Sequence, residues 1–123
     1  MPAGKHDIYI EQGATWSLPL IWQTAEGVPI DVTGYTARMH IRKKLADDEF
    51  EVELTTENNS IAIGGADGAI TLSLTAAQTA AMDIKGGVYD LEMIKGDVVT
   101  RLLEGTVIIS LEVTRQQDAR RPR

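Results

Sequence analysis

The sequence predicts an all-β domain, an antiparallel immunoglobulin-like or Greek-key β-sandwich with one short helix near 75–83. Apolar and polar residues alternate with a period of two along most of the chain, which is typical of half-buried strands. Eleven glycines and four prolines divide the chain into short segments, and Phe occurs only once. A chain of 123 residues, 43% of them hydrophobic, has the size of one domain with one core.

The alternation predicts eight or nine strands, separated by residues that favour turns. Pro19 lies in the second strand and lacks a backbone N–H, so this strand is expected at a sheet edge or a bulge. Asp31 is expected to accept backbone donors in the turn 32–34, where Gly34 can supply a positive φ. These eight or nine strands are expected among ten segments, 7–11, 16–22, 28–32, 37–42, 50–55, 60–63, 70–74, 89–94, 98–103 and 107–114.

One segment departs from the strand pattern. Thr75 is followed three residues later by Gln78, which matches a capping box at a helix N-terminus. Good helix formers follow as far as Met82, so a helix of two turns is expected to cross between the sheets.

The apolar face of each alternating strand identifies candidate core residues. Eight side chains are predicted to be buried, namely Trp16, Leu20, Met39, Ile41, Leu72, Leu91, Ile109 and Leu111.

Charge is distributed unevenly and divides the chain into a domain, residues 1–114, and a basic C-terminal tail, residues 115–123. The tail has four arginines and one aspartate, a net charge of +3, which leaves −9 on the other 114 residues. The polar composition of the tail cannot bury enough apolar surface to offset the entropy of ordering.

The net charge of the whole chain, −6, argues against a general nucleic-acid binder, which needs a cationic surface.

Several chemistries lack their usual residues. The chain has no cysteine, and its two histidines, His6 and His40, lack the spacing of a metal site, so no metal or cofactor is expected. No run of 18 apolar residues or signal-peptide pattern occurs, so no membrane partner is expected.

Glu51 and Glu53 are two residues apart on an expected strand, which places their carboxylates about 7 Å apart, between the two glycosidase geometries. A solvated acidic strand edge explains the same spacing, because Asp47, Asp48 and Glu49 continue the acidic run. Catalysis is therefore not expected.

Several stretches of turn and strand residues carry a resemblance to one group of proteins. The stretches are Ile10–Trp16, Leu20–Trp22, Gly27–Arg42, Gly68–Leu72, Gly87–Glu92, Leu103–Val107 and Glu112–Arg115. They resemble small tail-associated proteins of double-stranded DNA bacteriophages and prophages, and are similar to the N-terminal β-sandwich of baseplate upper proteins, which attach receptor-binding proteins to the tail. The resemblance spans about residues 7–115.

The resemblance implies a structural subunit of a phage virion, made in the host cytoplasm, whose partners are other virion proteins and copies of itself. A tail or baseplate adaptor is expected; a capsid decoration protein or a carbohydrate-binding module is the alternative, and a small glycan-active enzyme using Glu51 and Glu53 is a further one. The basic tail of one copy is expected to meet the acidic segment of the next. The candidate assembly contacts are Arg115, Arg120, Arg121, Arg123, Asp47, Asp48, Glu49, Glu51 and Glu53.

Overall fold

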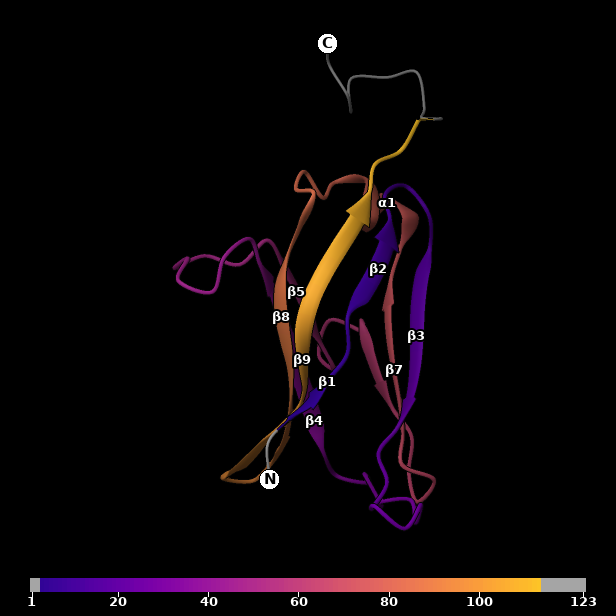
Figure 1. The fold of residues 1–123 in the computed structure, drawn as a ribbon. Helices are drawn as coiled ribbons and strands as arrows, with labels where there is room; N and C mark the ends of the chain where they lie inside the picture. The colour runs from indigo at the N-terminus through magenta and orange to yellow at the C-terminus, as the bar shows by residue number, and fades with distance from the viewer. Residues whose placement is uncertain (1–2, 114–123) are drawn as a thin grey trace.

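The computed structural model describes residues 3–113, which form two β-sheets packed face to face and one short helix (Figure 1). The larger sheet has the order β1-β9-β8-β4-β5, with β2 also paired to β9, and the smaller sheet has the order β3-β7-β6. The predicted all-β sandwich with one helix is therefore confirmed. The elements are β1 (Gly4–Lys5), β2 (Ile8–Glu11), β3 (Trp16–Ile21), β4 (Thr36–Arg42), β5 (Val52–Thr55), β6 (Ile61–Ile63), β7 (Ala69–Leu74), α1 (Ala76–Ala80), β8 (Gly86–Lys95) and β9 (Val98–Ser110).

The last two predicted strands are one continuous strand, β9, of 13 residues. It pairs with β8 antiparallel from Val98 to Ile108, and the register shifts once, between Leu91 and Glu92 of β8. Side chains alternate between the two faces of a strand, so a shift of one residue exchanges the face that points into the core. The irregularity allows the long hairpin to keep its apolar side chains on the core face.

Most strand pairs are antiparallel, as expected, but at the N-terminus β1 and β2 pair with β9 in parallel. Gly105 permits this close approach, since a Cβ at that position would lie 2.3 Å from the carbonyl oxygen of His6. The hydroxyl of Tyr89 donates to the same carbonyl over 2.5 Å. The hydroxyl and the backbone N–H of Thr106 both donate to Asp7, and these hydrogen bonds hold its pKa below the ordinary value.

The core lies between the two sheets, and most of the predicted core residues are in it. Met39, Ile41, Leu72, Leu91 and Ile109 are buried, as predicted.

Three predicted core residues are less buried than expected. Trp16 and Leu20 are half-buried and pack against the core, because β3 is the edge strand of the smaller sheet. Leu111 is 48% exposed, so its predicted burial is wrong. The reason is that β9 ends at Ser110, and the chain then leaves the sheet.

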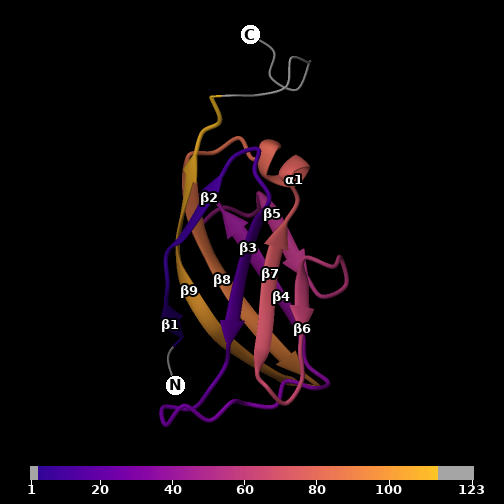
Figure 2. The same ribbon diagram turned by 90° about the vertical axis from the view of Figure 1, so that its right-hand side faces the viewer.

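The predicted strand at 28–32 is also wrong, because only one isolated bridge, between Gln23 and Pro29, forms there. This segment is the crossing from β3 in one sheet to β4 in the other (Figure 2). The turn chemistry within it is as expected: the Asp31 carboxylate accepts from the N–H of Thr33, and Gly34 has a φ of 85°. The edge position predicted for Pro19 is confirmed, since β3 is an outer strand.

The helix α1 is shorter than the two turns expected, but its capping box is present, with reciprocal hydrogen bonds between Thr75 and Gln78. Next to α1, the buried side chain of Gln12 donates to the carbonyl of Met82 and accepts from the N–H of Glu112. Gln12 thus fixes the path by which the chain leaves β9. No helix among residues 3–113 is long and apolar enough to cross a membrane.

Replacement of Leu91 by Ala should lower the free energy of unfolding by about 2–5 kcal/mol, because it removes a fully buried side chain and leaves a cavity. Val28→Ala is the matched control, since Val28 is 58% exposed, and it should change stability by less than about 0.5 kcal/mol. Urea denaturation measures both. Equal effects of the two variants would show that the register assigned to β8 is wrong.

Tyr89→Phe should weaken the dependence of stability on alkaline pH. Burial, and then the negative charge of Asp7, raise the pKa of Tyr89 to about 12. The unfolded pKa is about 10, so the stabilisation is complete below pH 10 and is lost as the pH rises toward 12. Chemical denaturation at pH 7, 10 and 11 should therefore show a smaller loss for the variant. Parallel losses in both proteins would contradict this assignment.

Candidate functional site

The outer face of the larger sheet carries most of the charged side chains that the fold brings together. Along β4, Met39 and Ile41 point into the core, so the residues between and beside them point outward. These outward residues are Arg38, His40 and Arg42. They lie opposite Glu92, Asp90 and Val88 of β8 in the antiparallel register.

A concavity of about 580 Å³ lies on this face and is called the groove below. Four strands and one loop contribute to its lining, so residues far apart in the sequence meet there. The lining comprises Lys5, Arg38, His40, Arg42, Leu45, Val88, Tyr89, Asp90, Glu92, Arg101, Glu104 and Gly105.

Three cations of the groove are paired with carboxylates. Lys5 bonds Glu104 and holds the pKa of that carboxyl below its ordinary value. Exposed pairs of this kind add little stability, but they fix where the charges lie. The other two pairings are Arg38 Nε to Glu92 Oε1 (2.7 Å), and Arg101 to Asp90 Oδ2 (3.4 Å) and Glu104 Oε1 (3.5 Å).

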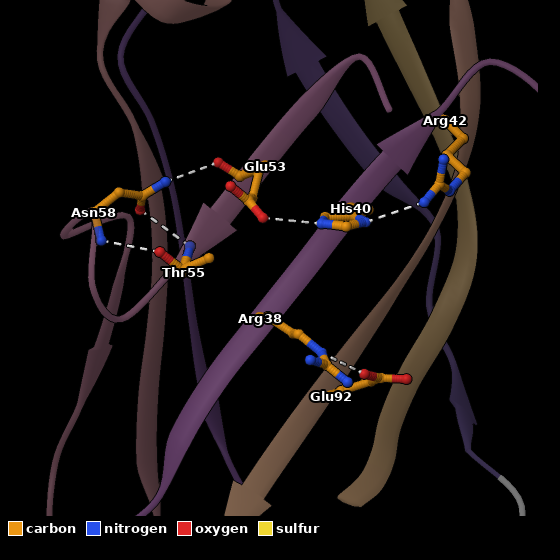
Figure 3. Close-up of polar contacts among 7 residues, drawn as sticks. All are labelled: Arg38, His40, Arg42, Glu53, Thr55, Asn58 and Glu92. Atoms are coloured by element: carbon orange, nitrogen blue, oxygen red, sulfur yellow. Dashed lines mark hydrogen bonds and ion pairs between the residues drawn. The ribbon is translucent and has the colours of Figure 1, made fainter. Parts of the chain in front are cut away.

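His40 lies at the centre of a hydrogen-bonded row that runs from β5 to the end of β4 (Figure 3). Its Nε2 is 3.1 Å from Glu53 Oε2, and its Nδ1 is 3.2 Å from Arg42 Nη2. A guanidinium can only donate, so Nδ1 accepts and the ring hydrogen is on Nε2, which donates to Glu53. The ring of Phe50 packs against the imidazole at a centroid distance of 4.5 Å.

The free edge of β5, the outermost strand beyond β4, is partly occupied by Asn58 (Figure 3). The side chain of Asn58 donates to the carbonyl of Glu53 and accepts from the N–H of Thr55, both over 3.0 Å. These are backbone groups with which an additional strand would otherwise pair. This edge is therefore less suited to strand addition.

The structure brings the predicted acidic residues together in and beside the loop between β4 and β5. Asp47 is half-buried, and its carboxylate accepts from the N–H of Lys44 at 3.2 Å. Asp48, Glu49 and Glu51 are exposed, and Glu53 on β5 bonds His40. Glu51 precedes the strand, and its N–H donates to the carbonyl of Ile41, which is also the register partner of Val52. The expected regular alternation of the two glutamates is thus interrupted.

The predicted basic contacts Arg115, Arg120, Arg121 and Arg123 lie outside the described residues. The cations that do meet on the outer face were not among the predicted contacts. The available signal was the alternation of basic residues with core residues along 37–42, which indicates a cationic outer face. Pairing with β8 and β9 could not be derived from that segment alone.

The groove does not have the composition of a metal centre. Among residues 3–113, no group of three or more His, Asp and Glu side chains is placed to hold a metal ion. His40 has Glu53 on one side and Arg42 on the other, and a guanidinium has no lone pair to offer a cation. The arrangement is suited to recognising charged and hydrogen-bonding groups of a partner.

Among solved structures, the fold is similar to the N-terminal domain of phage TP901-1 ORF48, with a TM-score of 0.50 and 11% sequence identity. The similarity covers 85% of this chain and 85% of that chain. No protein-family model matches the sequence, and no curated protein matches it. The chain thus resembles a domain of a phage protein, and at this level of identity the likeness concerns the fold.

Proposed function

We propose that the chain is a structural subunit of a bacteriophage virion that acts by protein–protein assembly, in the tail or baseplate. The observation that carries this proposal is the likeness of its fold to the N-terminal domain of a phage protein over 85% of both chains. The sequence also resembles baseplate upper proteins in separate turn and strand motifs, and this resemblance supports a place in the tail or baseplate.

The polar groups of the molecule support an assembly role. Two of the three buried polar side chains within residues 3–113 serve the fold: Gln12 and Thr79 bond backbone groups that hold the end of the sandwich together. Many of the charged side chains, by contrast, are gathered on the outer face and in the loop beside it. Charges in such positions set the orientation and rate of association more than its strength.

We infer a non-enzymatic adaptor, which holds other virion proteins, such as a tail fibre or receptor-binding protein, and copies of itself. The two carboxylates considered for glycan chemistry support this reading. Glu51 and Glu53 are both on the exposed side of the molecule, and Glu53 is engaged by His40. The net charge of −6 favours protein partners over nucleic acid.

Location in the particle tests this function. Phage particles produced by the strain that carries the gene should be labelled at the tail end by antibodies raised against the purified chain, as seen by electron microscopy. Label on the head would instead indicate a capsid decoration protein. Absence of the chain from purified particles, with presence in the lysate, would contradict a virion role.

The basic tail is proposed to contact the acidic segment 47–53 of a neighbouring subunit. Truncation after Thr114 should therefore lower the occupancy of the chain in particles. It should also make this occupancy less sensitive to the salt concentration, because salt screens exposed ion pairs. A full-length chain with the four tail arginines replaced by glutamine is the matched control for tail length, and it should behave like the truncated chain. Undiminished occupancy with unchanged salt sensitivity would show that the tail makes no assembly contact.

A further inference from the structure

A projecting loop and a concavity lie side by side on the outer face. Residues 43–51, called the β4–β5 loop below, extend away from the larger sheet on the side opposite the smaller one (Figure 1). Leu45 in this loop is 85% exposed and also lines the groove. A convex element beside a concave one on a single face is what two copies need to interlock about a two-fold axis.

Within the described part of the chain, Arg42 is the cation of the groove without a carboxylate partner. Its guanidinium donates to the carbonyl of Asp47 and to Nδ1 of His40, both over 3.2 Å. Of residues 3–113, none places a carboxylate oxygen within 4 Å of it, in contrast to Lys5, Arg38 and Arg101. A guanidinium has five N–H donors arranged to bind a carboxylate, so Arg42 retains capacity for an anionic group.

The loop supplies such groups. Asp48, Glu49 and Glu51 are exposed, and within the described part of the chain none of them forms an ion pair. Lys43 and Lys44 precede these acids and offset part of their charge, but the loop as a whole carries a net charge of −2, from two lysines and four acids. Among the described residues, none of the loop acids pairs with this cation in its own subunit, yet their charge complements it in another copy.

We propose that two copies of the chain pair face to face about a two-fold axis, with the β4–β5 loop of each seated in the groove of the other. Leu45 of each copy then contacts the apolar wall formed by Val88, and Asp48 or Glu49 approaches Arg42. An apolar anchor surrounded by charged groups is the usual arrangement of a specific protein interface. This proposal deepens the assembly role by naming one of its surfaces, and rests on that role only for its place in the virion.

Sedimentation velocity of the purified full chain tests the proposal. The chain should form a dimer as its concentration rises to about 300 µM, a range that detects weak association. Raising the salt from about 50 to 500 mM should weaken the dimer by about tenfold, because the contacts are partly ionic. A chain that remains monomeric at the highest concentration and lowest salt would overturn the proposal.

Variants identify the surface. Leu45→Ser, and Asp48→Lys with Glu49→Lys, change exposed side chains that make no hydrogen bond within residues 3–113, so both should fold normally and remain monomeric. The controls are Val28→Ser, and Glu26→Lys with Asp97→Lys, which make the same changes at exposed sites outside the loop and the groove. Controls that lose the dimer, or loop variants that keep it, would overturn the assignment of this surface.

Charge exchange gives the most specific test. Arg42→Glu should abolish the dimer of that variant, and mixing it with the Asp48→Lys, Glu49→Lys variant should restore a mixed dimer, because both contacts then join opposite charges. Failure to form the mixed dimer when both variants are folded by circular dichroism would contradict the pairing. If Arg42→Glu does not fold, the Leu45→Ser result decides.

Two further experiments distinguish the proposed dimer interface from a contact made by the tail, and from the proposed role in the virion. The chain truncated after Thr114 should dimerise as the full chain does; loss of its dimer would show that the tail forms the contact. A monomeric chain that labels phage tails would refute the paired surface and leave the virion role standing. A dimer that is absent from particles would refute the virion role alone.

Discussion

Backbone pairing along β9 is the constraint on which the rest of the structure depends. This strand hydrogen-bonds β8 on one side and both β1 and β2 on the other, so it joins the N-terminal segment to the last hairpin. The parallel pairing places Ile8 and Ile10 beside Val107 and Ile109, and all four side chains are buried in the core. The close approach requires Gly105, because any side chain there would meet the backbone of His6. Without this pairing, the end of the sandwich beneath α1 would lose one wall of its core.

The same strands that build the core also determine the candidate interaction surface. Because side chains alternate across a strand, burying Met39 and Ile41 of β4 necessarily directs Arg38, His40 and Arg42 to the outer face. The antiparallel pairing of β4 with β8 and of β8 with β9, including its single register shift, determines which residues lie beside them. The groove is thus built mainly on strands of the larger sheet. The acidic β4–β5 loop beside it is held at its base by the hydrogen bond from Arg42 to Asp47 and by the packing of Phe50 on His40.

Alternation in the sequence was sufficient to predict the strands and the burial of residues such as Leu91, because burial of one face is a local property of a strand. It was insufficient where other parts of the chain decide the outcome. Leu111 continues the pattern of β9 but lies beyond the last ladder pair, and the segment 28–32 has strand-forming residues but crosses between sheets. Alternation carries no information about strand direction, so the parallel pairing of β2 was missed. The acidic segment was visible in the sequence, whereas the groove depends on β1, β4, β8 and β9 meeting, which no single segment encodes.

Native-state hydrogen exchange at the parallel edge tests the central claim most directly. The amide of His6 donates to the carbonyl of Glu104, and that of Gln12 donates to the carbonyl of Ser110, so these two bonds bracket β2 on β9. If the parallel pairing holds the core together, both amides should exchange with a free energy close to that of global unfolding, as should those in the β8–β9 hairpin. Exchange of the His6 and Gln12 amides as fast as that of the β4–β5 loop, with the hairpin still protected, would show that the N-terminal strands are peripheral and would contradict this account.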